Sequence, residues 1–177
     1  MKLLLAALLS LTLVVAKAEE TIQTDPFDLT NLESKVEELG IVNKAEVDAL
    51  EIQARNLFNA NDCQAAIPVL AEYARKSNWL ANMIAASLDP YYGASYDDRK
   101  DYPYSKLSKL VPLETMANEY KAKRNIARAM EAECHMRTGN NEKAIPLLLN
   151  TLDLLAIDNE TWWKRTRENL LSIIGVE

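Results

Sequence analysis

The segments AIPVL at residues 66–70 and AIPLL at residues 144–148 are nearly identical and lie 78 residues apart. The similarity continues toward the N-terminus of both segments. The residues aligned at this offset are Ala54 with Ala132, Phe58 with Met136, and Asn61-Asp62 with Gly139-Asn140. Each copy therefore has the pattern of a helix, a tight turn and a second helix, and such internal similarity indicates a helical repeat array.

Apolar residues recur at intervals of three and four along most of the chain after residue 30, which predicts an all-α fold. Because the connections are short, consecutive helices should be antiparallel. The first predicted helices are residues 31–39, a segment capped by Asn43 that ends near residue 60, a segment from the turn at 61–62 to about residue 77, and residues 79–88. A helical pattern resumes beyond Pro112 and continues to about residue 137, as one long helix or as two abutting helices. A segment around residues 144–155 and a final helix after residues 158–159 complete the set. That final helix has Trp163 and Leu170 on one face and is expected to cap the stack.

Residues 89–104 interrupt the helical pattern with proline and glycine, and they hold five of the seven tyrosines. Tyrosine offers a large amphipathic contact area and is enriched in binding hot spots. Tyr91, Tyr92, Tyr96, Tyr102 and Tyr104 could therefore form a recognition surface, and Tyr91, Tyr92 and Tyr96 are the candidate partner-binding residues. The alternative is that the rings fold back and cover an interrupted repeat unit.

At the repeated residues the chain resembles the tetratricopeptide repeat family, whose unit of about 34 residues places small residues where two helices cross. The residues at such positions are Ala54, Ala66, Ala132 and Ala144. Two units match, at about residues 45–78 and 123–156, and an irregular unit at 79–120 would complete a stack. The chain departs from the family at Asn78 and Ala156, where proline is usual. A plain antiparallel helical bundle is the alternative.

The resemblance implies a protein or peptide partner, bound along a groove that the first helix of each unit lines. By alignment, the groove residues are Asp48, Glu51, Arg55, Phe58 and Asn59 in the first copy, and Ile126, Ala129, Glu133, Met136 and Arg137 in the second. We expect Arg55, Phe58, Asn59, Met136 and Arg137 to contact the partner. The alternative is that these positions only cover a solvated face.

The beginning of the chain has the pattern of a signal peptide over residues 1–18, with an apolar segment at 3–15 followed by small residues. The apolar segment is shorter than the about 20 residues that span a bilayer. We therefore expect a protein without stable membrane insertion after signal cleavage, located in the periplasm or secreted. A flexible leader at 19–29 and a helical repeat domain at 30–177 should follow. An uncleaved anchor is the alternative.

The two cysteines, Cys63 and Cys134, have two interpretations in an exported protein. They could form one disulfide, or they could be two buried thiols on separate helices. The distance between their Cα atoms decides between these alternatives.

The overall composition disfavours several classes of function. The formal net charge of −6 makes nucleic acid an unexpected partner, because a phosphate backbone would be repelled. A single histidine and the lack of a nucleophile paired with a base leave no catalytic, metal-binding or cofactor-binding residues to name. A basic ridge of Lys121, Arg124 and Arg128 could face an acidic partner or anionic lipid, or form a solvated face paired with Glu119 and Glu131.

These observations lead us to expect an exported, non-enzymatic protein-protein interaction module, acting as an adaptor or scaffold in the cell envelope. The alternative function is a periplasmic carrier or sensor of a small ligand, with a pocket between helices.

Overall fold

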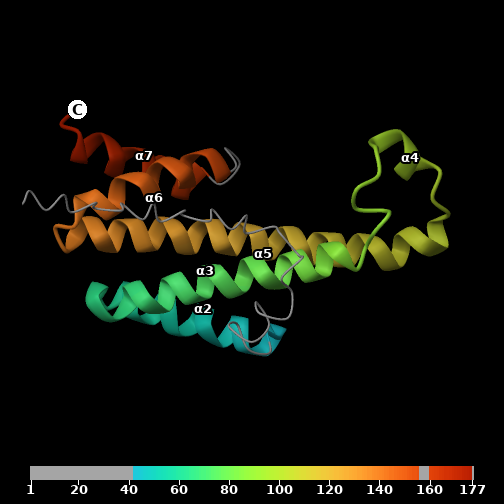
Figure 1. Cartoon of the computed structure of the whole chain (residues 1–177), viewed down its shortest axis with the longest axis horizontal. Helices are drawn as coiled ribbons and strands as arrows, with labels where there is room; N and C mark the ends of the chain where they lie inside the picture. The colour runs from blue at the N-terminus through green and yellow to red at the C-terminus, as the bar shows by residue number, and fades with distance from the viewer. Residues whose placement is uncertain (1–41, 156–159, 177) are drawn as a thin grey trace, which may run out of the picture.

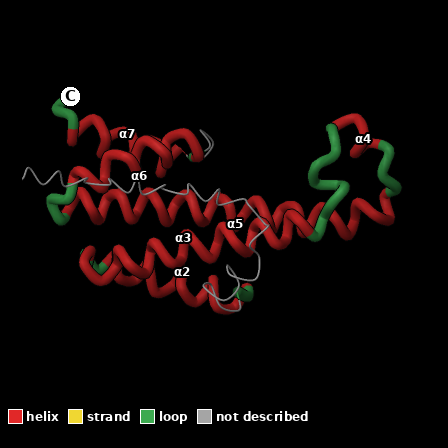
Figure 2. The backbone as a smooth tube through the Cα atoms, in the orientation of Figure 1, coloured by secondary structure: helices red, strands yellow, loops and turns green. Residues whose placement is uncertain are grey.

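The computed structural model describes residues 42–155 and 160–176. This part of the chain is helical and contains no strand, which confirms the expected all-α class. Its helices are α2 (Lys44–Asn59), α3 (Cys63–Ala86), α4 (Tyr96–Lys100), α5 (Tyr104–Arg137), α6 (Asn141–Leu154) and α7 (Glu160–Ile173) (Figures 1 and 2). The expected signal peptide at 1–18, leader at 19–29 and helix at 31–39 lie outside the described residues.

Helix α5 is the spine of the fold. It packs against α3 on one side and against α6 on another, while α2 covers α3 and α7 covers α6 (Figure 1). Smaller contacts join α5 directly to α2 and α7. The N-terminal part of α5 extends past the end of α3, and the loop that carries α4 lies beside this extension.

The turns between α2 and α3 and between α5 and α6 have the same backbone structure. Asn61 and Gly139 each adopt a positive φ, of 60° and 77°. The next residue in each turn donates its N–H to a carbonyl near the end of the preceding helix, at 3.0 Å from Asp62 to Leu57 and at 2.8 Å from Asn140 to His135. This is the Schellman arrangement, and it occurs at equivalent positions 78 residues apart.

Small residues form the contacts between the helices of each pair. The four alanines aligned by the repeat, Ala54, Ala66, Ala132 and Ala144, are all completely buried. Leu70 and Leu148, also equivalent by the repeat, are buried beside them. Because alanine has no side chain beyond Cβ, the helix axes can approach closely at these positions. One apolar cluster lies among α2, α3 and α5, and a second lies between α5 and α6 with α7 packed against it.

Helix α3 does not end near Ser77 as the sequence pattern predicted, but continues to Ala86. Serine and asparagine lower helix stability by only a few tenths of a kcal/mol compared with better formers. Ser77 is completely buried, and Trp79 and Leu80 continue the buried surface beyond it. Burial of these side chains therefore stabilises the helix beyond Ser77, although serine and asparagine are weak helix formers.

Helix α5 begins at Tyr104, which is eight residues before the predicted start at Pro112. Pro103 takes the N-cap position with φ −60°, a value that proline favours. Pro112 lies inside the helix and removes only its own N–H from the hydrogen-bond ladder. Ser108, whose carbonyl loses that donor, is exposed, so water can satisfy it. The connection between α3 and α5 spans residues 87–103, close to the predicted loop at 89–104, and it includes the short helix α4.

Cys63 and Cys134 form a disulfide, with their Cα atoms 4.9 Å apart. The bond joins the first residue of α3 to the last turn of α5, close to both helix turns. Arg137 on α5 also donates to the Asn61 side chain at 2.8 Å, which ties the same two turns by a second contact. The two copies of the repeat are thus fastened to each other near their turns.

Candidate partner-binding site

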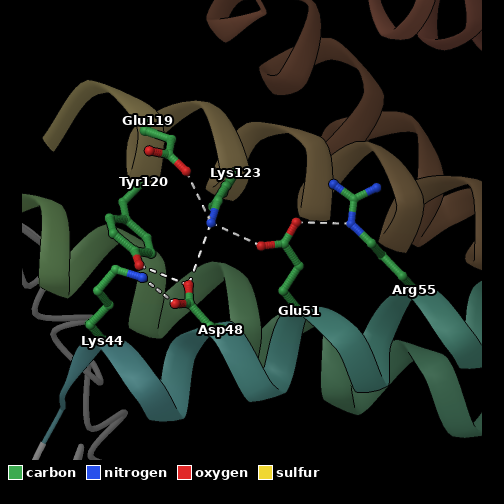
Figure 3. A network of polar contacts seen from close by, with 7 residues as sticks. All are labelled: Lys44, Asp48, Glu51, Arg55, Glu119, Tyr120 and Lys123. Carbon is green, nitrogen blue, oxygen red and sulfur yellow. Dashed lines mark hydrogen bonds and ion pairs between the residues drawn. The ribbon is translucent and has the colours of Figure 1, made fainter. Parts of the chain in front are cut away.

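The groove residues of α2 form a polar cluster with α5, which we call the α2–α5 cluster (Figure 3). Its members are Lys44, Asp48, Glu51, Arg55, Glu119, Tyr120 and Lys123. Asp48 and Glu51 lie about one turn apart on α2, so both carboxylates face α5. The Lys123 Nζ lies 3.0 Å from Glu51 Oε2 and 3.5 Å from Asp48 Oδ1. One ammonium group therefore bridges the two helices.

Further contacts satisfy the remaining groups of this cluster. The Tyr120 hydroxyl donates to Asp48 at 2.8 Å, Glu119 lies 3.2 Å from the Lys123 Nζ, and Arg55 donates to Glu51 at 2.9 Å. Burial alone would raise the pKa of Glu51, but Lys123 and Arg55 outweigh it and hold that pKa below its ordinary value. The α2–α5 face is therefore internally paired.

A second group of groove residues meets the last helix at the other end of α2. Glu133 on α5, with only 5% of its side chain exposed, accepts two hydrogen bonds from Arg165 of α7, at 2.5 and 2.6 Å. Arg137 pairs with the same carboxylate from one turn further along α5. Burial would raise the pKa of Glu133, but the bonds and charges of these two arginines outweigh it and lower that pKa.

The ring of Phe58 lies inside this second group, which we call the Glu133 cluster. The Arg137 and Arg165 guanidinium carbons lie 4.8 and 5.5 Å from the centre of the ring. Trp162 packs against it with ring centres 6.2 Å apart. Phe58 is 6% exposed. The aromatic side chain proposed for partner contact therefore joins α2 to α7 within the fold.

The other predicted groove residues have different surroundings. Met136 is half-buried and packs against the buried cluster of Ala132, Ala144 and Leu148 between α5 and α6. Asn59 is exposed at the end of α2. The sequence offered no signal for the role of Arg165, because its partner Glu133 lies on another helix and is 32 residues away.

Five of the seven tyrosines lie on the protruding end of the molecule, which we call the tyrosine arm (residues 87–116). Tyr91 points inward, is 5% exposed, and donates to Glu114 of α5 at 3.0 Å. Arg99 donates to the other oxygen of Glu114 at 2.7 Å and stacks over the Tyr91 ring at 4.9 Å. Tyr102 packs edge-on against Tyr91, with ring centres 5.3 Å apart. These contacts fix the loop on α5.

The arm presents its other tyrosines in two ways. Tyr92 is half-buried, and its hydroxyl oxygen accepts a hydrogen bond from the Lys121 Nζ at 2.5 Å. Tyr96 and Tyr104 point outward, with 77% and 85% of their surface exposed. Val111 and Leu113, also exposed, add apolar surface on the same part of α5. Tyr104 belongs to the same tyrosine-rich segment as the candidate residues Tyr91, Tyr92 and Tyr96.

The described residues contain neither a metal-binding cluster nor a membrane-spanning helix. Within these ranges, no group of three or more histidine, cysteine or acidic side chains is arranged to hold a metal ion. No helix of this part of the chain is long and apolar enough to cross a bilayer.

No protein-family model, curated protein or solved structure significantly matches the sequence.

Proposed function

We propose that the chain is an exported, non-enzymatic protein-interaction module that presents the tyrosine arm to a protein partner. The observation that carries this proposal is the exposure of Tyr96 and Tyr104 on an arm that Glu114 holds in place. Exposed aromatic rings on a pre-ordered surface bind at low entropic cost, because the segment is already ordered before the partner binds.

The internal pairing of the predicted groove favours the arm as the contact surface. A partner that entered between α2 and α5 would have to displace the contacts of Lys123 with Glu51 and Asp48. Phe58 is already enclosed by Trp162 and two arginines. The exposed rings of Tyr96 and Tyr104 can contact a partner without the loss of such bonds.

We propose a tetratricopeptide-like arrangement for the scaffold that carries the arm. Two features support it: the equivalent turns at Asn61 and Gly139, and the buried alanines at the helix crossings. In this arrangement α2 and α5 are the first helices of the two matching units, and α7 caps the stack. The Cys63–Cys134 disulfide supports export, since such bonds persist mainly in oxidising compartments.

The experiment is co-purification of the full-length protein from the envelope fraction of cells that produce it, with and without the outward tyrosines. We expect the Tyr96→Ala, Tyr104→Ala double variant to lose a protein that wild type retains. Ile52→Ala is the matched control, because it removes an exposed apolar side chain, 63% accessible, from α2. Equal retention by the double variant and wild type would contradict the proposal.

A further inference from the structure

A cleft of about 570 Å³ lies among α3, α5 and α6, and it is lined by other residues than the two clusters above. Arg75 and Asn78 from α3, Arg124 and Arg128 from α5, and Asn150 and Asp153 from α6 are its polar lining. Ala74 and Leu154 supply apolar wall. Its volume is typical of a site for a small molecule. The lining holds three guanidinium groups and one carboxylate, on a protein that is acidic overall.

The three arginines differ in their partners. Arg75 forms two hydrogen bonds with Glu72, both 2.9 Å long, and Arg128 pairs with Glu131 at 2.9 Å. Arg124 has no carboxylate within ion-pair distance among the described residues, and its side-chain bonds go to two neutral amide oxygens, at 2.6 Å on Asn78 and 2.9 Å on Asn125.

The side chain of Arg124 is held in a fixed position. Asn125 is buried, and its amide nitrogen donates to the Leu154 carbonyl at 2.7 Å. The oxygen of the same amide accepts from the Arg124 Nε, while Asn78 accepts from a terminal nitrogen. These two bonds occupy two of the five N–H groups of the guanidinium. The remaining donors are therefore pre-positioned on a cleft wall.

The electrostatic environment of Arg124 is unfavourable without a ligand. Burial, together with the nearby charge of Arg128, lowers the pKa of Arg124 from its ordinary value. A desolvated cation without a counter-charge destabilises the fold. Guanidinium groups match the two-oxygen geometry of carboxylate and phosphate and bind them through paired hydrogen bonds.

We propose that this cleft binds a small organic anion through its carboxylate or phosphate group, with Arg124 as the central contact. This site is independent of the tyrosine arm, since no residue of the arm lines the cleft. The oxyanion supplies the counter-charge that Arg124 does not find among the described residues, and the Ala74 and Leu154 side chains contact the apolar part of the ligand.

The test is calorimetric titration of the full-length protein with inorganic phosphate and, separately, with succinate, at an ionic strength fixed by chloride. We expect saturable binding of at least one of these probes. Binding of phosphate alone would assign the site to phosphate compounds, and binding of succinate alone would assign it to carboxylates. If neither probe binds, the proposal is overturned.

Two pairs of variants connect binding to the cleft. Arg124→Gln should weaken the affinity at least about tenfold, whereas Lys109→Gln, which removes an exposed positive charge elsewhere on α5, should leave it unchanged. Asn150→Asp should also abolish binding, because it adds a negative charge to the lining.

Asn141→Asp is the control for Asn150→Asp, since it makes the same change at an exposed position outside the cleft. The Asn150 variant keeps the test decisive if Arg124→Gln fails to fold. Equal affinities in wild type and Asn150→Asp would show that the anion binds elsewhere and would overturn the assignment.

Discussion

Asn61 and Gly139 stand 78 residues apart and occupy the same left-handed position in two equivalent helix turns. In both turns the residue that follows bonds back to the preceding helix, which ends that helix and reverses the chain. Glycine adopts this conformation without the steric conflict that a Cβ atom introduces, while asparagine tolerates it better than most residues. The two copies of the sequence repeat therefore share the same backbone conformation at their turns.

The first prediction concerns this conformation. Gly139→Ala should lower the free energy of unfolding by about 1 kcal/mol, because alanine is strained at a φ of 77°. Urea denaturation measures the change. The control is Gly93→Ala, since Gly93 has no such φ and an added Cβ would make only an ordinary contact, 3.7 Å from Asp89. Equal stability of the two variants would argue against the left-handed turn.

The second prediction concerns the disulfide. The bond closes a loop of 71 residues, so the loop-entropy description gives a stabilisation of about 4 kcal/mol. The Cys63→Ala, Cys134→Ala double variant should therefore melt roughly 10 °C lower than wild type. Intact mass with and without reduction and alkylation tests the bond itself. Two freely alkylated thiols in the native protein would disprove it.

The third prediction concerns the buried carboxylate of Glu133. Glu133→Gln should lower stability at pH 7 by about 2 kcal/mol, because Arg165 and Arg137 lose their counter-charge. The folded-state pKa of Glu133 lies below its ordinary value of 4.5. Its contribution is therefore fully present above that value and is lost as the pH falls through the folded-state pKa.

Urea denaturation over a pH series measures this effect. The difference between wild type and Glu133→Gln should be constant near neutral pH and shrink below about pH 4.5. A difference that does not change with pH would indicate that the substitution disturbs packing rather than an ion pair.

The fourth prediction concerns the α2–α5 cluster. Lys123→Met should lower stability by about 2 kcal/mol, because it leaves Glu51 and Asp48 without the charge that joins α2 to α5. Thermal unfolding measures the change. Lys109→Met removes a lysine from an exposed site on the same helix and should shift stability by less than about 0.5 kcal/mol. Similar effects of both variants would mean that the cluster adds nothing specific.

The fifth prediction concerns the arm. Glu114→Ala removes the acceptor that Tyr91 and Arg99 share, so the loop at 87–103 should open locally more often. Limited proteolysis should then cut this loop faster, with little change in the melting temperature. Glu142→Ala, an exposed substitution on α6, is the control. Unchanged proteolysis of Glu114→Ala would show that other contacts hold the arm.

The sequence predicts the helix pairs well where local signals and packing agree. Asn43 caps α2 as expected, accepting a hydrogen bond from the Glu46 N–H at 3.0 Å, and the turn after α2 lies where the repeat places it. The predicted break at Ser77 and the predicted start at Pro112 are wrong. At Ser77 burial outweighs a residue that is locally unfavourable for helix, whereas at Pro112 the exposed helix continues with the loss of a single N–H donor.

The candidate site is only partly readable from the sequence. Alignment of the repeats placed Glu51, Phe58 and Glu133 on related faces, and the structure brings each of them to a contact between helices. Their partners Lys123 and Arg165 were not predictable, because no local pattern reports which distant helix a charged side chain will meet. The division of the tyrosines into inward and outward rings likewise depends on tertiary contacts.

The most direct test of the proposed function is site-specific photo-crosslinking in intact cells, with a photoreactive side chain in place of Tyr104 or, as a control, of Ile52. Both positions are exposed, but only Tyr104 belongs to the tyrosine arm. We expect a discrete adduct with one protein from position 104 and none from position 52. A discrete adduct from position 52 with none from position 104 would contradict the assignment of the tyrosine arm as the partner-binding surface.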